Sequence, residues 1–100
     1  MIQVRFHGEA TEEAEAAVRW YNERVPGLGD DFRVELLGAI ERILRAPLLP
    51  PPSAYDPRAR RYLLPRFPYG VVYVTQADLS IVVIAVAHAR RRPKYWLGRF

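Results

Sequence analysis

The residues best suited to chemistry lie near the end of the chain. The segment HARRRPKYW, residues 88–96, places a histidine, four cations and two aromatic residues directly after the uncharged run SIVVIAVA. RNA cleavage without a metal needs a base for the 2′-hydroxyl proton, cations for the charge that develops on phosphorus, and an acid for the leaving oxygen. His88 and Tyr95 could exchange these protons, and the neighbouring arginines could hold phosphate.

The charge of the chain is unevenly distributed. Residues 1–50 carry six Lys or Arg against nine Asp or Glu, a formal charge of −3, whereas residues 51–100 carry nine against two, a formal charge of +7. Such asymmetry points to an anionic partner for the second half. We predict that the side chains binding this anionic partner or target are Arg61, Arg66, Arg90, Arg91, Arg92 and Lys94.

Aromatic residues are interleaved with these cations, among them Tyr62, Phe67, Tyr69, Tyr95 and Trp96. Cations for phosphates and flat side chains for bases are the composition of a surface that binds single-stranded nucleic acid. The same residues also allow a purely structural interpretation. The aromatic residues can belong to the core, the arginines can be solvated, and a lone histidine at the end of a strand is more often structural than catalytic.

Several kinds of site are excluded by the residues that the chain lacks. There is no cysteine, which excludes disulfides, thiolate catalysis and cysteine-ligated metals. The second half has only two carboxylates, Asp56 and Asp78, both in predicted loops, which argues against a carboxylate pair there. No glycine-rich phosphate loop, metal-ligand spacing or nucleophile elbow is present, so we expect no metal and no cofactor.

The segments that must position these residues begin with a strand and two helices. Alternating apolar residues at Ile2, Val4 and Phe6 predict a strand over residues 1–6, and HGEA reads as a turn. Helical spacing predicts helices over residues 11–25 and 30–46, separated by PGLG, with Thr11 as the first N-cap and Pro47 closing the second helix. The apolar faces that we expect to be buried are Ala14, Ala17, Val18, Tyr21 and Val25 on the first helix and Phe32, Leu36, Ala39, Ile40 and Ile43 on the second.

The second half reads as a connector followed by three strands. Residues 47–57 hold five prolines in eleven residues, which predicts an extended, polyproline-like connector. Strands follow over residues 59–67, 69–76 and 80–89, the first at a sheet edge because of its prolines and the last two as a tight hairpin. The order β-α-α-β-β-β predicts one α+β domain over residues 1–100, a mostly antiparallel sheet with a helical hairpin on one face.

The run IVVIAVA is apolar at successive positions, so both of its faces should be buried. The helical hairpin can cover only one face of the sheet. The other face either carries an apolar patch for a partner or is covered by the C-terminal residues of the chain itself. No run of 18 apolar residues and no signal peptide is present, which predicts a soluble, cytoplasmic protein without a membrane partner.

The segments carry a recognisable family pattern. The stretch from EAEAAVRWYNERVPGLGDDF to IERILRAP resembles the helical hairpin of the RelE/ParE superfamily, the toxins of bacterial type II toxin–antitoxin modules. RRYLLPRFPYGVVYV and IVVIAVAHARRRPKYWLGR resemble the sheet of that superfamily. The resemblance implies a toxin neutralised by a cognate antitoxin, which would cover the second face of the sheet and through which an oligomer could form.

The resemblance leaves two targets open. ParE-like members inhibit DNA gyrase, whereas RelE-like members are ribosome-dependent mRNA endonucleases; if this chain is an enzyme, the resemblance implies a metal-independent endoribonuclease. His88, Arg90 or Arg91, and Tyr95 match the C-terminal functional region. Relatives active on RNA often place an arginine where this chain has Gly70, and lysines where its connector has prolines and arginines. These departures favour the gyrase inhibitor over the mRNA endonuclease, with a non-toxic nucleic-acid-binding module as a weaker alternative.

Overall fold

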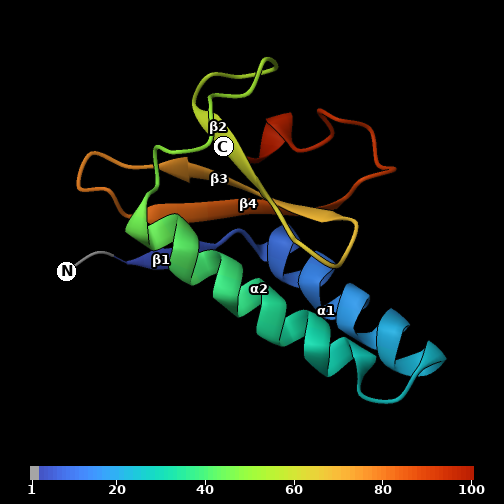
Figure 1. Ribbon diagram of the computed structural model, residues 1–100. Helices are drawn as coiled ribbons and strands as arrows, with labels where there is room; N and C mark the ends of the chain where they lie inside the picture. The colour runs from blue at the N-terminus through green and yellow to red at the C-terminus, as the bar shows by residue number, and fades with distance from the viewer. Residues whose placement is uncertain (1–2) are drawn as a thin grey trace.

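The computed structural model describes residues 3–100, in which two helices lie side by side on one face of a four-stranded sheet (Figure 1). The elements are β1 (Val4–Phe6), α1 (Gly8–Arg24), α2 (Leu28–Arg45), β2 (Ala59–Leu63), β3 (Tyr69–Thr75), β4 (Ile81–His88) and the short 3-10 helix η1 (Leu97–Arg99). This arrangement confirms the predicted α+β class, the β-α-α-β-β-β order and the helical hairpin on one face.

The strands are arranged in the order β1-β4-β3-β2. β1 runs parallel to β4, and the other two pairings are antiparallel, so the sheet is mostly antiparallel as predicted. β2 lies at one edge, which agrees with its flanking prolines. The turn between β3 and β4 is closed by the N–H of Gln76, which donates to the carbonyl of Ser80 at 2.9 Å.

The apolar spacing of the helices predicted their buried faces well. All five expected residues of α2 are buried, and on α1 Ala14, Ala17 and Val18 are buried while Tyr21 is partly buried. Val25 is an exception with 53% of its surface exposed, because α1 ends at Arg24 and the chain turns away there. Ile2 lies outside the described residues.

The first helix begins earlier than predicted. α1 starts at Gly8, and its N-cap is His7, whose Nδ1 accepts a hydrogen bond from the N–H of Glu9 at 3.1 Å. The predictions of a turn at HGEA and of Thr11 as N-cap are therefore wrong. The reason is that an imidazole nitrogen can accept the capping bond that a hydroxyl usually accepts.

The second helix also begins earlier, at Leu28, and its N-cap is Gly27, whose left-handed backbone (φ 90°) a glycine adopts without strain. Its end at Arg45 agrees with the predicted stop at Pro47. The start of the proline-rich connector turns, since Leu49 N–H donates to the Ala46 carbonyl at 3.1 Å, whereas Pro52 forms an isolated antiparallel β-bridge with Arg60. The expectation of an extended connector is therefore wrong for its first residues, whereas the backbone at Pro52 is extended as expected.

β4 is buried along nearly its whole length because it is an inner strand packed on both faces, and a β-bulge changes which of its residues face each side. Val72 of β3 is opposite Ala85, but Tyr73 is opposite Val83, so Ile84 is an extra residue. Ile84 and Ala85 consequently both pack on the face away from the helices, whereas Val83 and Val86 pack against the helices. We call the face away from the helices the tail face.

The C-terminal residues cover part of the tail face (Figure 1). Trp96 is only 4% exposed and packs with Ala59, Val72 and Ile84, with Tyr95 and Leu97 partly buried beside it. Of the two sequence-based alternatives for this face, cover by the chain's own tail is therefore the one found. Within the described chain, no helix has both the length and the apolar character needed to cross a membrane.

Candidate target-binding surface

The four cations after β4 lie on one exposed loop, residues 89–95, which we call the cationic loop. The loop is built from successive turns: Arg91 N–H donates to the His88 carbonyl at 3.0 Å and Tyr95 N–H to that of Arg92 at 3.3 Å. The side chains of Arg90, Arg92 and Lys94 are exposed and form no ion pair within residues 3–100. These three charges are therefore available to an external anion.

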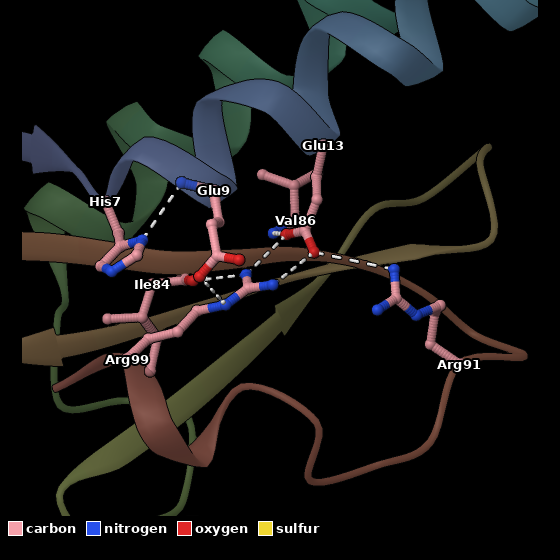
Figure 2. Close-up of polar contacts among 7 residues, drawn as sticks. All are labelled: His7, Glu9, Glu13, Ile84, Val86, Arg91 and Arg99. Atoms are coloured by element: carbon pink, nitrogen blue, oxygen red, sulfur yellow. Dashed lines mark hydrogen bonds and ion pairs between the residues drawn. The ribbon is translucent and has the colours of Figure 1, made fainter.

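The residues that follow the loop hold it against the molecule. Trp96 is buried on the tail face, and the guanidinium of Arg99 forms an ion pair with Glu13 of α1 (Figure 2). Arg91 points back toward the same carboxylate, with 3.8 Å between its Nη1 and Oε2 of Glu13. Of the four cations of the loop, Arg91 is thus the one that is partly neutralised inside the protein.

His88 ends β4 and is half-buried. Its Nδ1 accepts a hydrogen bond from the N–H of Arg90 at 3.0 Å, so a proton on the neutral ring is carried by Nε2. The ring meets that of Tyr69 edge-on with 5.0 Å between centroids. Together with Trp20, Tyr21 and other residues, His88 lines a groove of about 550 Å³ between α1 and the ends of β3 and β4.

The ring of Tyr95 is contacted by two guanidinium groups. Arg91 lies 3.9 Å and Arg99 4.9 Å from the centre of its ring. Its hydroxyl is buried without a hydrogen-bond partner in the described chain. Burial, followed by the nearby Glu13 carboxylate, raises the pKa of this hydroxyl well above its usual value. A hydroxyl so placed is poorly suited to give up or take a proton.

Arg61 lies on β2, with its side chain on the tail face. It lines two hollows: one of about 400 Å³ between the connector, Pro93 and Trp96, and one of about 260 Å³ above Gly70 and Ala87. A Cβ at Gly70 would lie 2.9 Å from both Cγ and Cδ of Arg61. The absence of a side chain at Gly70 therefore makes room for the stem of Arg61 across the sheet.

Arg66 is directed toward the helices instead. Its Nε donates to Oε1 of Glu35 on α2 at 2.8 Å, and its main-chain N–H donates to Oε2 at 2.9 Å. Burial of Glu35 opposes its ionisation, but these bonds from Arg66 outweigh it and hold the pKa of the carboxyl below its usual value. The charge of Arg66 is thus balanced within the protein.

The sequence-predicted site residues are therefore only partly gathered. Arg90, Arg91, Arg92 and Lys94 share one loop, and Arg61 faces the same side of the sheet as the C-terminal residues. Arg66 is engaged on the helical side, and the aromatic ring that His88 meets is that of Tyr69 and not that of Tyr95. Within residues 3–100, no group of three or more side chains of the kinds that bind metals is gathered.

Sequence reasoning missed Glu13 and gave Arg99 no specific role. A weak signal was present, because Glu9 and Glu13 are one helical turn apart and must share a face of α1. Both acidic residues contact Arg99, Glu9 through its Oε2 at 3.4 Å from Nε. Which cation they would meet could not be read from the spacing.

Comparison with known proteins agrees with this fold. The model of the ParE toxin of the type II toxin–antitoxin system, parDE, matches residues 4–93. A solved structure described as a chromosomal ParDE TA system from P. aeruginosa is similar with a TM-score of 0.77 at 12% sequence identity, over 90% of this chain and 98% of that chain. No curated protein matches the sequence significantly. Because the family model spans most of its length, the chain belongs to the ParE toxin family of type II toxin–antitoxin systems.

Proposed function

We propose that this protein is a cytoplasmic toxin that inhibits DNA gyrase through its cationic loop and is neutralised by a cognate antitoxin. The observation that carries the proposal is the set of three exposed cations, Arg90, Arg92 and Lys94, that have no ion pair within residues 3–100. Unpaired cations on one loop attract an anionic surface and speed association with it. Membership of the ParE family supports the same role.

The geometry of the two candidate proton carriers supports binding over RNA cleavage. His88 uses Nδ1 to accept a bond from the main chain, and the hydroxyl of Tyr95 is buried. General acid–base catalysis needs both groups within reach of the same substrate. The solved relative is described as a ParDE toxin–antitoxin system, which supports a cognate antitoxin as the partner.

Two assays run side by side test the target. We expect the purified protein to inhibit supercoiling by DNA gyrase and to leave mRNA intact on translating ribosomes. The triple variant Arg90→Gln, Arg92→Gln, Lys94→Gln should lose the inhibition. A matched control removes three exposed cations elsewhere, Arg5→Gln, Arg19→Gln and Arg45→Gln, and should retain it. Equal loss in both variants would mean that net charge, and not the loop, is responsible.

The RelE-like alternative has one observation in its favour, the groove that His88 and Arg91 line together. It predicts mRNA cleavage on the ribosome with unaffected supercoiling, and that outcome would overturn the gyrase proposal. Cleavage should then disappear in the double variant His88→Ala, Tyr95→Phe while the fold is retained. Overexpression without growth arrest would instead support the non-toxic nucleic-acid-binding module.

A further inference from the structure

The C-terminal residues are held on the molecule by side chains. Ala89 N–H donates to the carbonyl of Pro68 at 2.8 Å, which ties the end of β4 to the β2–β3 loop. Beyond Ala89, the main-chain hydrogen bonds of the described chain run only between near neighbours in residues 88–99. The position of the cationic loop therefore depends on what the side chains after it contact.

Two of these side chains are buried, one apolar and one charged. Trp96 packs on the tail face, and Arg99, with 10% of its side chain exposed, reaches α1. Nη1 and Nη2 of Arg99 each lie 3.0 Å from one oxygen of Glu13, so the pair is bidentate. Nη1 also donates to the carbonyl of Ile84 at 2.9 Å (Figure 2).

The ion pair lies against β4 where β1 has ended. β1 pairs with β4 only over Ile81–Val83. Beyond this point the N–H of Val86 donates to Oε1 of Glu13 at 2.9 Å, and the carbonyl of Ile84 accepts from Arg99. The carboxylate and the guanidinium thus take the hydrogen bonds that a longer β1 would have taken at the bulge. Glu13 keeps this guanidinium partner only while the tail is docked, and losing it leaves a largely buried carboxylate without its counter-charge, which is unfavourable.

We propose that Glu13 and Arg99 are positioning residues for the cationic loop. With Ala89 bound at one end and Arg99 at the other, the loop between them is held in one arrangement, in which its three unpaired cations face the target together. An ordered loop binds more tightly than a mobile one because less conformational freedom is lost on binding. This inference rests on the proposed function, since it concerns how the same loop meets its target.

Trp96 provides a probe of tail docking that is independent of the target. In a Trp20→Phe background it is the only tryptophan. We expect Arg99→Gln to shift the Trp96 emission to the red and to increase its quenching by acrylamide, with an unchanged far-UV circular dichroism spectrum. The concentration for half-inhibition of gyrase should rise about tenfold, because the freed loop must then be ordered on binding at a cost of about 1.4 kcal/mol. Arg99→Lys should restore both properties in part.

The matched control is Arg33→Gln, which breaks the exposed ion pair between Arg33 and Glu15, 3.2 Å apart and away from the tail. It should change neither the emission of Trp96 nor the inhibition. Where Arg99→Gln lowers the helical signal, Glu13→Gln takes its place, because its amide oxygen still accepts from Val86.

Three outcomes separate the claims. An unchanged Trp96 emission in both charge-removing variants would show that the ion pair does not hold the tail, and would overturn the inference. A shifted emission with unchanged inhibition would overturn it as well, since the loop would then act without being positioned. A wild-type protein that does not inhibit gyrase would overturn the proposed function instead, while the emission still decides whether Glu13 and Arg99 hold the tail.

Discussion

Among the side chains of residues 3–100, the hydroxyl of Tyr95 is the polar group that is buried without a hydrogen-bond partner. We expect Tyr95→Phe to raise the free energy of unfolding at neutral pH by about 1 kcal/mol, because the variant no longer buries an unpartnered hydroxyl. Urea unfolding followed by circular dichroism measures the change. A loss of stability would mean that the hydroxyl makes a favourable contact after all.

The same residue predicts how stability depends on alkaline pH. The folded pKa of Tyr95 is raised, whereas an unfolded tyrosine ionises near about 10. Ionisation of Tyr95 in the unfolded chain therefore costs no stability below about pH 10, and it lowers the free energy of unfolding as the pH rises from there toward the folded pKa. Tyr95→Phe should lose less stability than the wild type between about pH 9 and pH 11. If the free energy of unfolding fell equally with pH in the two proteins, the raised pKa of Tyr95 would be contradicted.

A second prediction at the scale of single residues concerns Gly70. A methyl group there would meet Cγ and Cδ of Arg61 at 2.9 Å and displace that side chain from the tail face. We expect Gly70→Ala and Arg61→Ala to weaken gyrase inhibition to a similar extent, and the double variant to be no weaker, because both changes remove the same group. Gly8→Ala, where a methyl group meets nothing within 4 Å, is the control. Additive losses would show that Gly70 acts by another route.

At the scale of elements, the helical hairpin depends on one close approach. A Cβ at Gly29 of α2 would lie 2.1 Å from the carbonyl oxygen of Val18 on α1, whereas a Cβ at Gly38 meets nothing within 4 Å. We expect Gly29→Ala to destabilise the protein by about 2–3 kcal/mol through overpacking. Gly38→Ala should stabilise it by roughly 0.5–1 kcal/mol through helix propensity. Thermal unfolding compares the two, and equal effects would contradict the close packing.

The elements themselves were predictable because burial follows spacing. Phe32, Leu36 and Ile43 recur at helical intervals, and that pattern alone determines which side of α2 faces the sheet. The N-cap at His7 and the bulge at Ile84 were not predictable, since each depends on a local geometry that several residue types can adopt. At the bulge, the N–H of Val86 binds Glu13 and the carbonyl of Ile84 binds Arg99, and these two groups determine where the ion pair forms.

The candidate site likewise has one part that was predictable from the sequence and one part that was not. The cations of residues 90–94 are adjacent in the chain, so their joint exposure was predictable from the sequence. The pairings of Arg66 with Glu35 and of Arg99 with Glu13 join residues 31 and 86 positions apart. Only the folded chain brings such groups together, which is why the sequence could not separate engaged arginines from free ones.

At the scale of the whole molecule, the acidic first half of the chain and the basic second half are joined by ion pairs. The fold therefore separates positive from negative charge less than the sequence does. Carboxylates of both helices neutralise cations of the second half, among them Arg66 and Arg99, which leaves the cationic loop as a local excess. We expect gyrase inhibition to weaken between about 50 and 200 mM salt, because exposed charges are screened over this range. The triple loop variant should respond less. A salt response that is the same in both proteins would place the electrostatic contact elsewhere.

The position of β4 in the sheet has a consequence for the synthesis of this protein. β4 is the last strand to be made, yet it lies between β1 and β3 and pairs with both. A nascent chain can form its helices first, but the sheet lacks an inner strand until β4 has been synthesised. The sheet therefore depends on a pairing between the earliest and the latest of the described strands, Val4–Phe6 with Ile81–Val83, which makes its formation slow relative to that of the helices.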